Sequence, residues 1–171
     1  MRNTCRCKKK KADNKEILNK KKLILLDRIS DPGNLGTIIR SASAFNADGI
    51  ILYGNCVEYY SPKVIRSSAG NFFKTPVYEI KNINDLKSLL KNHFKIATML
   101  SEENNISLKE SALIDKCVIM FGSEAVGLSD ELIKISDKNI RLDMKKNVES
   151  LNLSISASII LYEMYINSRK N

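Results

Sequence analysis

The chain has 171 residues, of which 43% are hydrophobic and 27% charged, so it is long enough to form one globular domain with a sizeable core. No apolar run approaches the roughly 20 residues that cross a bilayer. The lysine-rich N-terminus has no apolar segment behind it, which argues against a secretory signal. We therefore expect a cytoplasmic protein that has no membrane partner.

The net charge of +9 is concentrated at the N-terminus. Residues 1–22 hold ten Lys and Arg against two acidic residues, so residues 23–171 are nearly neutral. We expect residues 1–22 to be a basic, flexible segment and residues 23–171 to form the domain. Such a segment binds polyanions by releasing counterions, and the alternative is a solvated leader without function.

The four cysteines are Cys5, Cys7, Cys56 and Cys117, and the single histidine is His93. A zinc site usually needs paired C-x-x-C motifs or a Cys/His cluster, and a disulfide scaffold needs a denser set of cysteines. We therefore expect reduced thiols and no metal.

Short apolar runs alternate with amphipathic stretches from Leu23 onward. The runs predict strands at 23–26, 49–53, 77–80, 95–99, 117–121 and 139–142. Between them, helical patterns occur at 35–45, 62–69, 84–92, 130–135 and 151–166. This alternation predicts an α/β domain with a mainly parallel sheet that helices cover on both faces. Ligands of such sheets bind beyond the carboxyl ends of the strands, so the loops that follow the strands are the informative ones.

The first of these loops contains Asp31-Pro32-Gly33, a turn-forming triplet. We expect Asn34 to cap the helix that follows. Arg40 lies about one and a half turns into this helix, in largely apolar surroundings. From its spacing alone, Arg40 is either a structural anchor or a side chain that points at a ligand.

The loop after the strand at 117–121 holds Gly122 and Gly127, five residues apart, with Glu124 between them. Glycines allow close backbone approach or a positive φ. The loop is neither a G-x-G-x-x-G fingerprint nor a P-loop. Taken alone, it is also explained by a tight turn between a strand and a helix.

A third segment, residues 148–157, leads into the last helix. We expect Ser150 to cap this helix, with Asn152 and Ser154 in its first turn, where exposed amides bind anions. Asn152 could equally satisfy local backbone groups. Small residues on the next turns allow another backbone to pack closely.

Together these segments, D-P-G-N-L-G-x-I-I-R, F-G-S-E-x-x-G-L-S and E-S-L-N-L-S-x-S-A in this order, resemble the SpoU/TrmH family of RNA 2′-O-methyltransferases. The stretch at 61–70 also resembles the pattern of this family. The resemblance covers roughly residues 22–167. It implies an α/β fold with a C-terminal deep trefoil knot, an exception to the rule that chains do not thread loops, and it implies a homodimer formed through the knot face.

The resemblance also implies S-adenosylmethionine as cofactor and RNA, either rRNA or tRNA, as partner. We lean toward rRNA. The residues that match cofactor-binding positions of the family are Thr98, Leu100, Gly122, Gly127, Leu142, Met144 and Leu151. Those that match its active-site positions are Arg40, Asn34, Glu124, Ser150 and Asn152. Arg28, Lys63 and Arg66 are expected to hold RNA phosphates, with Lys74 nearby.

The resemblance implies Arg40 as the catalytic residue. An arginine stays protonated, so it either acts as a base in an unusual state or orients phosphate and stabilises the developing alkoxide. The sequence departs from the family pattern at Leu142-Asp143-Met144 and Lys146, where a proline and a glycine are missing. We expect a less rigid loop and weaker cofactor binding.

Three alternatives stay open from the sequence. The first is a noncatalytic RNA-binding or ribosome-assembly protein on the same fold. The others are a nucleotide-dependent oxidoreductase, which would need a glycine fingerprint that this sequence lacks, and a base methyltransferase on a related knot.

Overall fold

The computed structural model describes residues 13–100, 104–145 and 150–169. Six strands form one sheet in the order β3-β2-β1-β5-β4-β6, and every neighbouring pair is parallel. The strands are β1 (Lys22–Asp27), β2 (Gly49–Tyr53), β3 (Val77–Ile80), β4 (Phe94–Thr98), β5 (Cys117–Phe121) and β6 (Lys138–Ile140). The predicted α/β fold with a parallel sheet is confirmed.

The main helices are α1 (Pro32–Ala44), α2 (Pro62–Ser67), α3 (Ile83–Leu89), α4 (Leu108–Ala112), α5 (Asp130–Ile133) and α6 (Leu153–Ser168). Two 3-10 helices, η1 (Asn14–Asn19) and η2 (Asn71–Phe73), complete the set. Helix α4 was not predicted; it is short and begins with a capping box between Ser107 and Glu110. None of the helices in the described ranges is long and apolar enough to cross a membrane.

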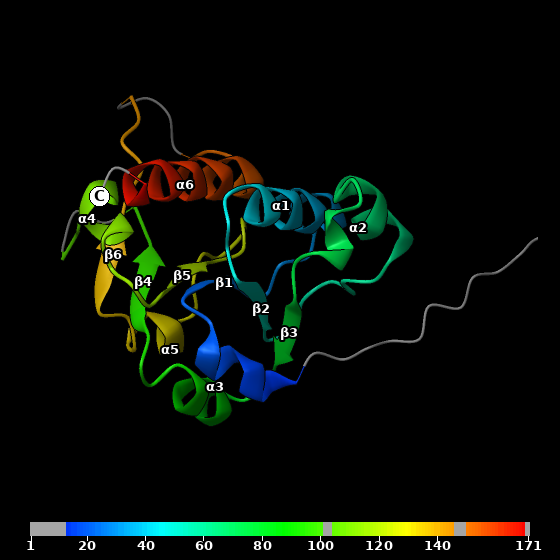
Figure 1. The fold of residues 1–171 in the computed structure, drawn as a ribbon, viewed down its shortest axis with the longest axis horizontal. Coiled ribbons are helices and arrows are strands. Elements are labelled where there is room, and N and C mark those ends of the chain that lie inside the picture. The colour runs from blue at the N-terminus through cyan, green and yellow to red at the C-terminus, as the bar shows by residue number, and fades with distance from the viewer. Residues whose placement is uncertain (1–12, 101–103, 146–149, 170–171) are drawn as a thin grey trace, which may run out of the picture.

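The sheet has a hydrophobic core on each face, because alternate residues of each strand point to opposite sides. In β1, Ile24 and Leu26 pack with α1 and α6, whereas Leu23 and Leu25 pack with η1, α3 and α5. Figure 1 shows α1, α2 and α6 on one side of the sheet and α3 and α5 on the other. Both faces are therefore covered, which explains why the strands are nearly continuous apolar runs.

The folded part of the chain begins before the predicted boundary at residue 23. Ile17, in η1, is fully buried against the sheet, and the backbone amides of Lys21 and Lys22 both donate to Asp48 Oδ2 at 2.8 Å. The expectation of a flexible segment up to residue 22 is therefore wrong for residues 14–22. Residues 1–12 lie outside the described residues, and for them the expectation stays a prediction.

Two predicted helix caps are wrong by a few residues. Asp31, not Asn34, caps α1, with its Oδ1 atom accepting from the Asn34 amide at 2.7 Å. Asn152, not Ser150, caps α6, with its Oδ1 atom accepting from the amides of Ser154 and Ile155. As a result, the Asn34 side chain is not used as a cap, and Asn152 has only its amide nitrogen left for other contacts.

The order of strands creates a switch point between β1 and β5, from which the connections lead to opposite sides of the sheet. The loops after β1 and β5 meet there, and the loop after β6 approaches from the neighbouring part of the sheet. Part of this last loop, residues 146–149, lies outside the described residues, so the trefoil knot stays a prediction.

Candidate active site

A cavity of about 630 Å³ lies at the carboxyl ends of β4, β5 and β6, against the start of α6. All seven residues that were predicted to bind the cofactor line it: Thr98, Leu100, Gly122, Gly127, Leu142, Met144 and Leu151. A smaller cavity, of about 130 Å³, lies between the amino ends of β1 and β5 and the C-terminal part of α6. The larger cavity is thus at the edge of the sheet where ligands of this architecture bind.

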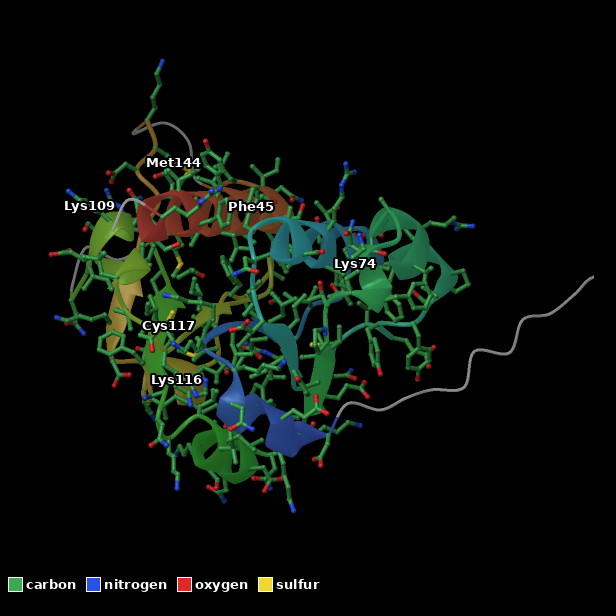
Figure 2. All side chains as sticks on the ribbon, viewed as in Figure 1. Phe45, Lys74, Lys109, Lys116, Cys117 and Met144 are labelled. Carbon is green, nitrogen blue, oxygen red and sulfur yellow. The ribbon has the colours of Figure 1, made fainter. Side chains whose placement is uncertain are left out.

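The wall of the large cavity combines apolar side chains with exposed backbone. Phe121, Ile140 and Ile160 contribute apolar surface, and Met144 lies beside α6 (Figure 2). Thr98 contributes a methyl group, because its hydroxyl donates to Met120 O at 2.9 Å. A lining of this kind suits a flat heteroaromatic group that main-chain donors recognise.

Gly122 is required where the loop after β5 closes on itself. A Cβ atom at this position would lie 2.0 Å from the carbonyl carbon of Gly127 and 2.1 Å from the nitrogen of Leu128. The Gly127 amide donates to Ser123 O at 2.9 Å, which closes the loop as a tight hairpin. The close backbone approach predicted for these two glycines is thus present between the ends of the loop.

The departure from the family pattern at Asp143 leaves the cavity wall intact. The Asp143 side chain is 99% exposed and lies 3.9 Å from Arg141 Nη2, whereas its neighbours Leu142 and Met144 line the cavity. The aspartate therefore occupies the outer side of the loop. Lys146, the second departure, lies outside the described residues.

Three of the predicted active-site residues form a chain of hydrogen bonds. Asn152 Nδ2 donates to Asn34 Oδ1 at 3.1 Å, and Asn34 Nδ2 donates to Glu124 Oε1. Because Asn152 Oδ1 is used in the helix cap, the Nδ2 end of the Asn152 amide faces Asn34 and donates to Asn34 Oδ1. The Nδ2 end of Asn34 therefore faces the carboxylate of Glu124. The three motifs, far apart in the sequence, thus meet at one side of the cavity, which Glu124 and Asn152 line.

The structure places the other two predicted active-site residues differently. Ser150 lines the cavity, whereas Arg40 is exposed and is not part of its wall. Six residues of an α-helix span roughly 600°, so Arg40 points about 120° away from Asn34. The side of α1 that faces α6 carries Ser41, whose hydroxyl lies 2.6 Å from that of Ser158. Within one chain, Arg40 is therefore turned toward solvent.

The residues predicted to hold RNA also separate into two groups. Lys63 and Arg66 are exposed on α2, and Lys74 projects from the end of η2 (Figure 2). Lys63 Nζ lies 3.9 Å from Asp31 Oδ2, at the start of α1. Arg28 instead forms a two-pronged contact with Asp27, with Nε at 3.0 Å from Oδ1 and Nη2 at 3.1 Å from Oδ2. Arg28 is thus engaged within the protein, and the expectation that these residues hold RNA phosphates stays a prediction.

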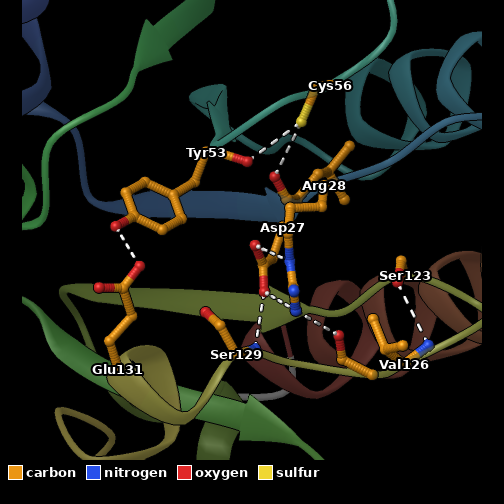
Figure 3. A network of polar contacts seen from close by, with 10 residues as sticks. Asp27, Arg28, Tyr53, Cys56, Ser123, Val126, Ser129 and Glu131 are labelled. Carbon is orange, nitrogen blue, oxygen red and sulfur yellow. Dashed lines mark hydrogen bonds and ion pairs between the residues drawn. The ribbon is translucent and has the colours of Figure 1, made fainter.

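Sequence reasoning missed the polar network around Asp27, which Figure 3 shows in close-up. Asp27 is a fully buried acid at the end of β1, and its Oδ2 atom accepts from the Ser129 amide at 2.7 Å. Nearby, Tyr53 Oη donates to Glu131 Oε1 at 2.5 Å. Burial, with this hydrogen bond, raises the pKa of Tyr53 well above its usual value. An acid that ends an apolar strand was the signal available in the sequence.

The comparison with known proteins bears on the same part of the chain. The model of the SpoU rRNA methylase family matches residues 21–162. A tRNA/rRNA methyltransferase of Synechocystis, itself uncharacterized, is 35% identical over 142 residues, which cover 82% of this chain and 51% of the relative. The 23S rRNA (uridine(2479)-2′-O)-methyltransferase of Streptomyces viridochromogenes is 30% identical over 82% of this chain and 50% of its own length.

Among solved structures, the AdoMet-bound rRNA methyltransferase of Sinorhizobium meliloti superposes with a TM-score of 0.82 and 30% identity. The match covers 91% of this chain and 60% of the other. The chain thus spans about half the length of the two relatives named above. With a family model that matches most of the chain and the three motifs joined at one cavity, the protein belongs to the SpoU rRNA methylase family.

Proposed function

We propose that this chain transfers the methyl group of S-adenosylmethionine to a ribose 2′-hydroxyl of RNA. The observation that carries the proposal is the hydrogen-bonded chain Asn152–Asn34–Glu124, which joins three motifs at the wall of a cavity large enough for the cofactor. The Streptomyces relative methylates a ribose 2′-oxygen, and the Sinorhizobium structure contains AdoMet. Both support the proposal.

The cavity fits the cofactor by its lining. Backbone groups of Gly122 and Gly127 and the side chains of Leu100, Leu142 and Met144 would hold the adenine and the ribose of the cofactor. When it is bound, S-adenosylmethionine supplies an electrophilic methyl carbon attached to a sulfonium. Polar groups at the edge of an apolar wall act on the reacting atoms in a lower dielectric than that of water.

The protein has to remove a proton as the ribose oxygen attacks. A new carbon–oxygen bond forms, the carbon–sulfur bond breaks, and the hydroxyl proton leaves to an acceptor. Glu124 is the one carboxylate among the described residues that line the cavity, and Asn34 orients it. We assign Glu124 to bind the ribose hydroxyl or accept its proton. The guanidinium of Arg40 would then stabilise the developing alkoxide or hold the adjacent phosphate.

Because Arg40 is exposed and is not part of the cavity wall of its own chain, we propose that the site is completed by a second copy. The outer face of α6 carries the exposed apolar residues Ile155 (51% exposed), Ile159 (38%) and Tyr162 (48%), and the stripe begins at Leu151 on the rim of the cavity. An apolar stripe at helical spacing is typical of a protein interface. A homodimer across this stripe would bring Arg40 of one copy toward the cavity of the other.

A mixture of two impaired variants, assayed at a cofactor concentration too low to fill the Gly122→Ala cavity, tests this arrangement. If Arg40 acts across the interface, then co-expressed Arg40→Ala and Gly122→Ala chains form heterodimers with one intact site, and methyl transfer returns. If Arg40 acts within its own chain, every heterodimer site carries one defect and the mixture stays inactive. A monomer at micromolar concentration in sedimentation would also contradict the proposal.

We propose rRNA or tRNA as the substrate class, held by Lys63 and Arg66 on α2 and by the basic residues that precede the fold. The cytoplasm stays the predicted compartment. A noncatalytic RNA-binding protein on the same fold is the second candidate, and it would bind RNA without transferring a methyl group.

The decisive experiment incubates the purified chain with labelled S-adenosylmethionine and unmodified total RNA, followed by mapping of 2′-O-methyl positions. We expect label at a discrete site, no transfer to RNA that is 2′-deoxy at that site, and a large loss of single-turnover rate for Arg40→Ala with unchanged folding. Binding of the cofactor without any transfer to rRNA or tRNA would instead favour the noncatalytic candidate.

A further inference from the structure

The ion pair of Asp27 and Arg28 joins a buried acid to a partly exposed arginine, and the proposed reaction does not use it. Asp27 is fully buried, and the side chain of Arg28 is 40% exposed. A buried carboxylate is strongly unfavourable unless charged or polar donors satisfy it. Here two guanidinium nitrogens and the Ser129 amide do so. Its contacts therefore show which parts of the protein it holds together.

The backbone of Arg28 is shaped to make this contact. Its φ is 55°, in the left-handed region that is unfavourable for residues other than glycine. This conformation turns the side chain back onto the preceding residue, and the Arg28 amide donates to Tyr53 O at 3.0 Å. The adjacent Gly54 leaves room, because a Cβ there would lie 3.0 Å from Arg28 Cγ. The strained turn is thus held in place by β2.

The same two side chains hold the far end of the loop after β5. Arg28 Nη2 donates to Gly127 O at 3.3 Å, and Asp27 Oδ2 accepts from the Ser129 amide at 2.7 Å. Figure 3 shows both contacts reaching from the end of β1 across to the loop. One ion pair therefore fixes the backbone on both sides of Leu128.

That backbone is the surface on which Gly122 packs. Because a Cβ at Gly122 would overlap the Gly127–Leu128 peptide, the position of this peptide sets the position of the Gly122–Glu124 wall of the cavity. Glu124 in turn accepts from Asn34. Movement at Gly127 would therefore displace both the proposed cofactor-binding backbone and the carboxylate.

We infer that Asp27 and Arg28 are positioning residues that hold the cofactor loop in its binding shape before the cofactor arrives. This inference rests on the proposed function in naming S-adenosylmethionine as the ligand. It gives Arg28 a role within the protein, because the guanidinium donates to three acceptor atoms there, whereas the role of Arg28 in holding RNA phosphate stays a prediction. Preorganisation of this kind raises affinity by removing the need to order the loop upon binding.

The test compares Arg28→Gln, Arg28→Lys and Asp27→Asn with Lys21→Gln. Lys21 is a matched control, because it forms an exposed ion pair with Asp115, 2.8 Å away. Calorimetry gives the affinity for S-adenosylmethionine, and hydrogen exchange without ligand reports on the Gly127 amide, which donates to Ser123 O. Circular dichroism and thermal melting identify variants that are folded at the assay temperature.

We expect Arg28→Gln to bind the cofactor at least about tenfold more weakly and to exchange the Gly127 amide faster, while Arg28→Lys recovers part of both. The double variant Asp27→Asn/Arg28→Gln should lose little more affinity than Arg28→Gln alone, because the two side chains act as one unit. Lys21→Gln should match wild type.

The outcomes separate this inference from the proposed function. If wild type does not bind S-adenosylmethionine, the proposed function fails, and hydrogen exchange alone still tests whether the ion pair holds the loop. Unchanged affinity and exchange in folded Arg28→Gln would overturn the inference while leaving the proposed function standing. Weaker RNA binding with normal cofactor affinity would overturn it as well, in favour of the phosphate role.

Discussion

Replacement of Gly122 by alanine is the most direct test of how the cavity is built. The new Cβ would lie 2.0 Å from the Gly127 carbonyl carbon, 2.1 Å from Leu128 N and 2.4 Å from Gly127 O. Ordinary contact begins at 3.4 Å, so one side of the hairpin has to move by more than 1 Å. The obstacle is backbone, which no change of rotamer can relieve.

Forced insertion of a methyl group into packed structure typically costs about 1–3 kcal/mol. We expect the upper end of this range, because the overlap involves three backbone atoms. The strain is relieved when the loop opens. Binding of the cofactor needs the closed loop, so it has to restore the strain. At about 1.4 kcal/mol for each factor of ten, about 3 kcal/mol corresponds to roughly 100-fold weaker affinity for S-adenosylmethionine.

Calorimetric titration of the folded variant measures this loss, with two alanine controls at glycines of positive φ. Gly127 (φ 68°) and Gly70 (φ 81°) have no atom within 4 Å of an added Cβ. Gly127→Ala should therefore weaken binding less than Gly122→Ala, through backbone strain alone. Gly70→Ala, outside the cavity wall, should leave the affinity unchanged. Binding by Gly122→Ala within threefold of wild type would refute the account of the loop.

Three further predictions concern separate parts of the molecule. Asn34→Asp removes the amide donor to Glu124 and should reduce the rate of single-turnover methyl transfer at least tenfold, while cofactor affinity stays within threefold of wild type. Equal losses of rate and affinity would instead place Asn34 in cofactor binding. Burial lowers the pKa of His93, whereas in the unfolded chain the imidazole binds a proton below about pH 6.5. The free energy of unfolding should therefore fall as the pH drops below that value, and urea unfolding of His93→Gln should show a smaller fall. Deletion of residues 1–12, which removes six Lys and Arg but keeps the buried Ile17, should reduce the salt dependence of RNA binding, and an unchanged slope would exclude these residues from the complex.

The sequence by itself determined the class of fold, because a strand that is buried on both faces must be a continuous apolar run and this signal is local. The six strands were therefore predicted to within two residues at either end. Helix ends were less certain. Both Asp31 and Asn34 are residue types that suit the N-cap of α1. Which of them forms the cap depends on whose side-chain oxygen reaches the free backbone N–H groups of the first turn.

Sheet geometry pointed to the loops that follow the strands, and the resemblance to the SpoU/TrmH family implied which residues of these loops surround the cavity. Only the tertiary structure decided how these residues meet. Asn34 contacts Glu124 and Asn152 across 90 and 118 residues of sequence, and no local pattern encodes such a contact. Likewise, Arg28 has the same sequence signature whether it faces RNA or turns back onto Asp27. The contact with Asp27 depends on the left-handed turn at Arg28 and on the position of Gly127 O, and both follow from how β1, β2 and β5 pack side by side.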